Sequence, residues 1–202
     1  MANWNVCYNW MMDNEDRTRA CKTVPDPVTP HLTPDMTEEE KQAEIQKAEN
    51  AQAISGINSY YFPVQFAKIA ALPQSQRAPA VQQFYKDELW NQWFDGLNSD
   101  EVGKRVLDAT VNMGGITAVK ILQRAINSAA HTYDDPVVTV DGKWGPATVR
   151  EANNIPVPDY LVIEFKRLRL GWYQDIVTKN PNKAKFLGTQ DNPGPWWRRA
   201  TA

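Results

Sequence analysis

Apolar residues along much of the chain recur three or four positions apart, the interval at which residues share one face of an α-helix. The pattern therefore predicts a mainly α protein. Asp141-Gly142 is a turn signal, so one small hairpin is expected around it. The segments with helical spacing are 60–72, 76–94, 99–113, 116–129 and 159–179, and a short helix is expected after Pro146.

The N-terminal segment is predicted to be a helix with an acidic end. Residues 4–15 are rich in aromatic residues and methionine, and Glu15 closes the segment. A carboxyl group that follows such residues has apolar neighbours available, and burial among them raises a carboxyl pKa. The residues at helical spacing are Trp4, Cys7, Tyr8, Met11, Met12 and Glu15.

Residues 28–52 are interpreted as an inserted, solvated element. Prolines recur through residues 16–36, which predicts a polar loop without regular structure. Thr37 and Glu40 then have the spacing of a capping box, in which each side chain satisfies a backbone N–H group at a helix start. The expected helix over 37–52 is almost wholly polar, so it is expected to form a flap beside the site.

Composition and charge are those of an ordinary globular protein. The 202 residues are 42% hydrophobic and 23% charged, with a formal net charge of −2. This balance gives no strong field for nucleic acid, so no nucleic-acid partner is expected. No apolar run approaches the length of a membrane span, so no membrane insertion is expected, and we expect a monomer.

The N-terminus lacks the basic and apolar regions of a signal peptide. We therefore expect synthesis in the cytoplasm. A role outside the cell would then require release through a holin pore, a secretion machine or lysis.

Cysteine and histidine give little support for metal or histidine chemistry. The chain contains no Cys-x-x-Cys and no Cys/His cluster, so neither a metal nor another cofactor is expected. Cys7 and Cys21 can form a disulfide only if the chain folds back after Glu15, and the sequence leaves that open. His31 and His131 lie in polar stretches and are expected in surface loops, which argues against a histidine-based triad.

Several motifs, taken in chain order, resemble the glycoside hydrolase family 108 muramidases with their C-terminal peptidoglycan-binding 3 segment. The resemblance covers nearly the whole chain. It departs from the family at the catalytic motif, where Asp16-Arg17 follows Glu15 in place of two glycines. The matching motifs are Glu15, Ser55-Gly56-Ile57, Tyr85 to Trp90, Asp108 to Gly114, Leu122-Gln123, Asp141-Gly142, Gly145, Thr148 and Trp196-x-x-Arg199.

The resemblance implies a lysozyme-like helical fold and a peptidoglycan hydrolase. Such an enzyme cleaves the β-1,4 bond between N-acetylmuramic acid and N-acetylglucosamine in glycan strands. Glu15 would be the general acid, which requires burial to raise its pKa. A second carboxylate would activate water or stabilise charge, and the candidates in order of preference are Asp26, Asp16 and Asp13.

Further residues are candidates for substrate binding. Asp108 and Asn112 lie four positions apart on one helix face, where they would either line a cleft or bond a neighbouring loop. Most of the eight tryptophans are expected in the core, but flat aromatic faces also stack on sugar rings. The full set of candidates is Asp16, Ser55, Trp90, Asp108, Asn112 and Trp144.

The resemblance divides the chain into a catalytic segment, residues 1–97, and a helical peptidoglycan-binding segment, residues 98–202. We expect the two to share one core. The remodelled motif after Glu15 leaves an alternative open, namely a non-catalytic peptidoglycan-binding protein on the same fold. A purely structural or interaction protein has no specific feature in its favour.

Overall fold

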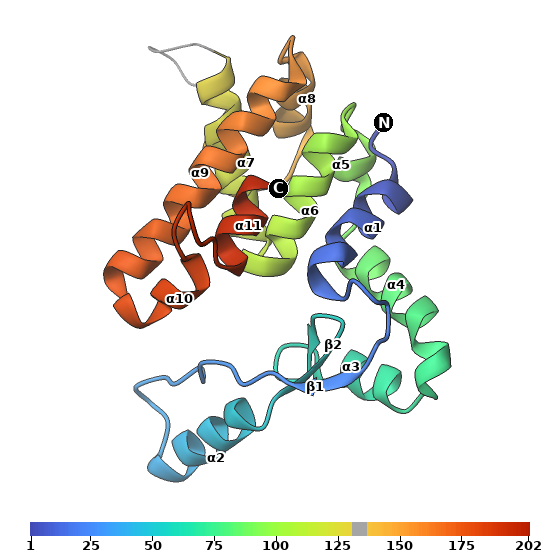
Figure 1. Ribbon diagram of the computed structural model, residues 1–202, viewed down its shortest axis with the longest axis vertical. Helices are drawn as coiled ribbons and strands as arrows, with labels where there is room; N and C mark the ends of the chain where they lie inside the picture. The colour runs from blue at the N-terminus through green and yellow to red at the C-terminus, as the bar shows by residue number, and fades with distance from the viewer. Residues whose placement is uncertain (131–136) are drawn as a thin grey trace. The chain divides into compact units, whose positions relative to one another are not determined.

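The computed structural model describes residues 1–130 and 137–202, and it is mainly α-helical with one small sheet (Figure 1). The predicted fold class is thereby confirmed at the level of secondary structure. The elements are α1 (Trp4–Glu15), β1 (Thr23–Pro25), α2 (Glu38–Glu49), β2 (Gln52–Ile54), β3 (Ile57–Asn58), α3 (Pro63–Ala70), η1 (Gln74–Gln76), α4 (Arg77–Glu88), α5 (Gln92–Asp95), α6 (Asp100–Met113), α7 (Gly115–Ala129), α8 (Pro146–Asn154), α9 (Pro158–Lys179), η2 (Pro181–Lys183), α10 (Ala184–Leu187) and α11 (Pro195–Thr201).

Helix ends form where capping chemistry predicts them. The Thr37 hydroxyl accepts from the Glu40 N–H, while the Glu40 carboxylate accepts from the Thr37 N–H, so the capping box is confirmed. Ser99 caps α6 by accepting from the Val102 N–H. Gly114, at a φ of 84°, separates α6 from α7, because this left-handed conformation suits glycine and ends the first helix.

The chain forms two compact units, and the boundary between them falls within α1. Residues 1–11 and 90–202 form one unit, and residues 12–89 form the other. Residues 1–11, predicted as part of the segment 1–97, group with residues 90–202. The Ala2 N–H donates to the Leu97 carbonyl at 2.5 Å.

In the unit formed by residues 1–11 and 90–202, α7 and α9 pack along each other, with α6 and α11 against α9. The buried faces of α6 and α7 carry the apolar residues that the helical spacing selected, including Val106, Leu122 and Ile126. Helix α1 approaches α6 closely at Gly103, where a Cβ atom would lie 3.0 Å from the Cys7 sulfur. Glycine therefore allows the two helices to pack at short range.

The unit of residues 12–89 contains a three-stranded antiparallel sheet in the order β1-β2-β3. Thr23 pairs with Ile54, and Ala53 pairs with Asn58. The expectation that residues 16–36 lack regular structure is therefore wrong for β1. A proline can close an edge strand because its missing N–H is not needed on the outer side, and Pro25 is the last residue of β1.

The hairpin expected around Asp141-Gly142 does not form among residues 137–145, the described part of that segment. The turn is held by a side chain of α7 instead of by a paired strand. The Gln123 amide donates to the Asp141 carboxylate at 2.8 Å, and the Gly142 N–H donates to the Gln123 side-chain oxygen at 2.9 Å. Buried Gln123 thus supplies the hydrogen bonds that a second strand would have made.

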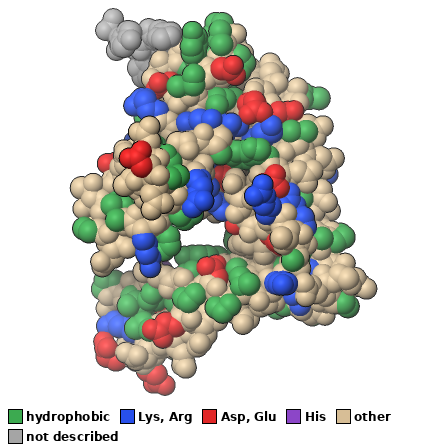
Figure 2. All heavy atoms as spheres, in the orientation of Figure 1, with side chains coloured by type: hydrophobic (Ala, Val, Ile, Leu, Met, Phe, Trp, Pro, Cys, Tyr) green, Lys and Arg blue, Asp and Glu red, His purple; other side chains and the backbone are tan. Residues whose placement is uncertain are grey.

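The structure shows where the charged side chains (Figure 2), the two cysteines and His31 lie. Acidic and basic side chains are interspersed on the face drawn in Figure 2. Cys7 and Cys21 are both free and buried. His31 is exposed, whereas His131 lies outside the described residues. Within residues 1–130 and 137–202, the helices are too short or too polar to cross a membrane.

Helix α2 has almost no apolar face, as the sequence predicts. Ala48 is its only buried residue. Its attachments include a hydrogen bond from the Val28 N–H to the Ala48 carbonyl and the contacts of Tyr60, whose hydroxyl donates to Glu44 and accepts from the His31 N–H. Ala51, which follows the helix, is buried and accepts from the Asp26 N–H through its carbonyl.

Replacement of residues 30–46 by a short Gly/Ser linker should therefore have little effect on thermal stability. The replacement removes exposed polar contacts but keeps Ala48 and Ala51, and changing loop length costs only about 0.6 kcal/mol per doubling. We expect the melting temperature to change by less than about 3 °C, measured by calorimetry. A replacement of 30–51 is the matched control and should lower it further. A large loss in the shorter variant would contradict the interpretation of α2 as a solvated element.

Candidate functional site

The site predicted around Glu15 is built on a tight turn in the unit of residues 12–89. Ser55 and Gly56 connect β2 to β3 with φ angles of 48° and 84°. Two positive φ angles in a two-residue loop are characteristic of the hairpin turns that match strand twist. Ile54 and Ile57, the residues on either side of the turn, are fully buried, so apolar packing holds both ends of the turn in place.

Glu15, the last residue of α1, lies against this turn. A Cβ atom at Gly56 would be 2.6 Å from the Glu15 carboxylate and 2.7 Å from the Tyr85 hydroxyl. The Tyr85 hydroxyl, on α4, donates to the Ser55 carbonyl at 2.8 Å and is buried with its ring. Only glycine fits at position 56, because the carboxylate and the phenol both need the space that a side chain would fill.

Asp16 contacts the same turn at Ser55, the residue before Gly56. Its carboxylate accepts from the Ser55 hydroxyl at 2.7 Å and from the Cys21 N–H at 2.8 Å. It also accepts from the Ala20 N–H and the Thr18 hydroxyl. The partial burial of Asp16 acts to raise its pKa, but these four hydrogen bonds outweigh it and hold the pKa below its ordinary value. Asp16 is therefore a fixed negative charge beside Glu15.

The other two candidate carboxylates lie elsewhere in the unit. Asp13 is exposed and pairs with Arg19 at 3.0 Å. Asp26 accepts from the side-chain amide of buried Asn58 at 2.7 Å, and its N–H donates to the Ala51 carbonyl. The Asp16 carboxylate therefore contacts Ser55 of the turn, and the Asp26 carboxylate contacts Asn58, two residues beyond Gly56.

Asp108 lies in the interior of the unit formed by residues 1–11 and 90–202. Its carboxylate is fully buried and pairs with Arg169 of α9 at 2.6 Å and with Arg199 of α11 at 3.5 Å. Asn112, one turn later on α6, accepts a hydrogen bond from the Tyr173 hydroxyl. Of the two roles that the sequence leaves open, these contacts match the bonding of neighbouring elements.

The two candidate tryptophans, Trp90 and Trp144, both contact Phe94. Trp90 is buried, stacks on Phe94 at 4.7 Å and donates to the Asp95 carboxylate at 2.8 Å. Trp144 is half-buried and meets the Phe94 ring edge-on at 5.3 Å. Both rings therefore pack against Phe94, and among the described residues the Trp144 indole N–H has no hydrogen-bond partner.

Three residues that position these groups were not among the sequence candidates. Tyr85 and Gly56 belong to the matching motifs without a predicted role, and Arg169 belongs to none of them. Arg169 follows Phe165 by four positions on α9, so it falls on the apolar face of that helix. A charged residue on a buried face requires a charged partner, so this position is the sequence signal by which an internal ion pair could be predicted.

Comparison with known proteins bears on the second half of the chain. Residues 117–200 match the family model described as "Predicted Peptidoglycan domain". The match runs from α7 into α11 and includes Gln123, Arg169 and Arg199. The chain matches no curated protein and no solved structure. The family match supports peptidoglycan as the partner of this part of the chain, whereas Glu15 lies outside the matched residues and its role stays a prediction.

Loss of the buried charge at Asp108 should destabilise the protein strongly. Asp108→Asn leaves Arg169 buried beside a neutral amide, and removing one partner of a buried pair typically costs about 3–5 kcal/mol. Denaturant unfolding monitored by circular dichroism would measure the change. Glu38→Gln is the control, because Glu38 is an exposed partner of Lys41, and such pairs contribute about 0–1 kcal/mol. Equal effects of the two substitutions would contradict a structural role for the Asp108 pair.

The lowered pKa of Asp16 predicts a pH-dependent contribution to stability. The unfolded chain has an Asp pKa of about 3.9, so the contribution is fully present above that pH and is lost as the pH falls through the folded pKa. The difference in melting temperature between the wild type and Asp16→Asn should therefore be constant from pH 5 to 7 and shrink below about pH 4. Asp191→Asn, at an exposed position, is the control. A difference that grows on acidification would contradict the assignment.

Proposed function

We propose that the protein is a peptidoglycan hydrolase that cleaves the β-1,4 bond between N-acetylmuramic acid and N-acetylglucosamine, with Glu15 as general acid. The observation that carries the proposal is the approach of the Glu15 carboxylate to the Ser55-Gly56 turn, which Gly56 alone permits. The match of residues 117–200 to a peptidoglycan domain supports the substrate class.

The proposed reaction needs one proton donor and one water molecule. The Glu15 carboxylic acid donates its proton to the glycosidic oxygen while the bond from that oxygen to the anomeric carbon breaks. Water adds to the anomeric carbon, and a proton from that water restores the acid. The products are two shorter glycans, one of which has a new reducing end.

We assign stabilisation of the developing positive charge on the sugar to Asp16. Its low pKa keeps it ionised, and it shares the Ser55-Gly56 turn with Glu15. Asp26, preferred from sequence, bonds the side-chain amide of Asn58 and stays the alternative for this role.

A second function is supported by a separate observation. The family match lies wholly in residues 117–200, and Asp16-Arg17 stands where the glycoside hydrolase 108 family has two glycines. A non-catalytic peptidoglycan-binding protein would need only the matched part. The two candidates differ in one measurable property, the release of reducing ends from glycan.

Glu15→Gln should abolish hydrolysis without unfolding the protein. The amide has nearly the shape of the acid but cannot donate the catalytic proton, a contribution of typically ~10²–10⁴-fold in rate. The measurements are loss of turbidity of a peptidoglycan suspension and the appearance of reducing ends. Glu39→Gln is the matched control, since Glu39 is exposed in the first turn of α2.

Two outcomes would separate the candidates. An active wild type and an equally active, folded Glu15→Gln protein would remove Glu15 from the mechanism. A wild type that sediments with peptidoglycan but releases no reducing ends would favour the binding protein over the hydrolase.

A further inference from the structure

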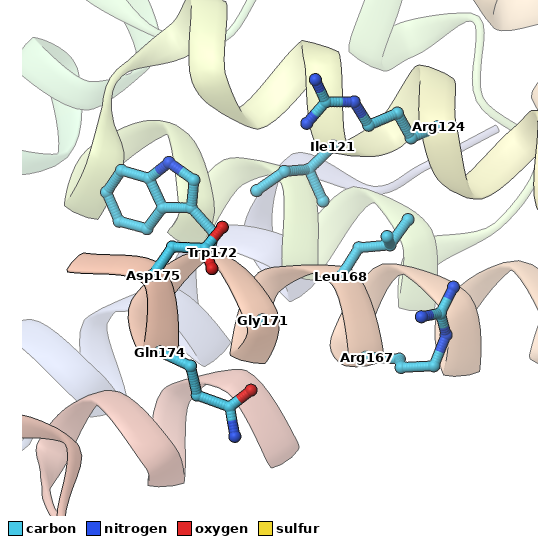
Figure 3. Close-up of a pocket in the computed structure, with 8 residues that line it drawn as sticks. All are labelled: Ile121, Arg124, Arg167, Leu168, Gly171, Trp172, Gln174 and Asp175. Carbon is cyan, nitrogen blue, oxygen red and sulfur yellow. The ribbon is translucent and has the colours of Figure 1, made fainter. Parts of the chain in front are cut away.

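A pocket of about 240 Å³ lies between α7 and α9, within the residues that match the peptidoglycan domain (Figure 3). Ile121 and Arg124 project into it from α7, and the remaining lining residues come from α9. Trp172 and Leu168 supply apolar walls, and Trp172 makes a T-shaped contact with the Tyr173 ring, with 5.3 Å between the ring centroids. The pocket therefore combines a fixed aromatic wall with charged side chains.

Two of the charged side chains that line this pocket, those of Arg124 and Asp175, do not hold the two helices together. Within the described residues, Arg124 and Asp175 form neither a hydrogen bond nor an ion pair through their side chains, although they line the same pocket from facing helices. Arg167 is held by Glu164 of its own helix at 2.7 Å. An open cation and an open anion on opposite walls fit a ligand end that carries both a carboxylate and an ammonium group.

Space in the pocket depends on a glycine. A Cβ atom at Gly171 would meet nothing within 4 Å, so the space above this residue is open. A volume of about 240 Å³ is below the roughly 300–1,000 Å³ of pockets that enclose drug-sized ligands. The pocket has room for the end of one amino acid side chain and is too small to enclose a disaccharide.

We propose that this pocket binds the peptide stem of peptidoglycan at its diamino acid, with Arg124 on a free carboxylate and Asp175 on the free ammonium group. The inference rests on the proposed peptidoglycan partner and names the part of it that residues 117–200 recognise. The aliphatic chain of the diamino acid would lie along Trp172. Guanidinium groups match carboxylates well because their N–H groups form a planar fork.

The stem is favoured over the glycan by the chemistry of the walls. Glycan strands present hydroxyl and acetamido groups, which do not require an unpaired guanidinium opposite an unpaired carboxylate. The stem presents free carboxylates and, at its diamino acid, a free amino group. Recognition of the stem would select uncrosslinked peptidoglycan, because a crosslink consumes that amino group.

The test is isothermal titration of the full-length protein with the tripeptide L-Ala-γ-D-Glu-meso-diaminopimelate. This probe contains no glycosidic bond, so its binding is independent of any hydrolysis by Glu15. The control probe is the same tripeptide with its diamino acid acetylated on nitrogen and amidated at its carboxyl groups. The protein variants are Arg124→Gln, Asp175→Asn and Gly171→Leu, and Arg198→Gln is the matched control at an exposed arginine of α11.

Binding of the tripeptide by the wild type should weaken about tenfold in Arg124→Gln and in Asp175→Asn, as expected for loss of one charge-assisted hydrogen bond. Gly171→Leu should fill the pocket and abolish binding, while Arg198→Gln should bind like the wild type and the control probe should not bind. Melting temperatures close to that of the wild type would verify that the variants fold. Binding that is absent in the wild type, or equal in all folded variants, would overturn the proposal. A hydrolase that releases reducing ends but does not bind the tripeptide would retain the proposed function and lose this inference.

Discussion

A single carboxylate, that of Asp108, pairs with two arginines in the interior of the unit formed by residues 1–11 and 90–202. The three charges come from α6, α9 and α11, so the ion pairs join helices that are far apart in sequence. Desolvating a charge is costly, and the cost is offset only while the partners stay together. The packing of α9 and α11 against α6 is therefore tied to one geometry, in which Tyr173 also reaches Asn112.

A comparable constraint acts in the unit of residues 12–89, although it is steric as well as electrostatic. The backbone at Ser55 and Gly56 is held in a left-handed conformation between two buried isoleucines. The absence of a side chain at Gly56 lets the Glu15 carboxylate approach the turn, and Asp16 bonds the adjacent residue. Rigid support of this kind lets a half-buried carboxylate keep one orientation, which a general acid requires.

The two units supply different halves of the proposed activity. The carboxylates Glu15 and Asp16 belong to residues 12–89, while the peptidoglycan domain match and the charged pocket of α7 and α9 belong to the other unit. In the proposed function the first would act on the glycan and the second would recognise the peptide. A polymer that repeats both sugar and stem gives such a pair of sites an advantage, because binding at one raises the effective concentration at the other.

Local patterns in the sequence determined most of the helices and their ends. Helical spacing of apolar residues, the Thr37–Glu40 capping box, the Ser99 cap and Gly114 act over four residues or fewer, and each has the predicted effect. The family resemblance likewise selected Asp108, Asn112 and Arg199, which the structure joins in one network, but it did not indicate that the network is buried.

Only the tertiary structure decided which distant residues meet. The sheet pairs Thr23 with Ile54 across the polar segment between them, and no local signal specifies that register. Position in the loop does not show which residues the candidate carboxylates contact: Asp26 bonds Ala51 and Asn58, and Asp16 bonds Ser55. Gln123 replaces the expected hairpin by bonding a turn 18 residues away. Long-range pairings depend on the packing of the whole chain, so spacing along the sequence cannot predict them.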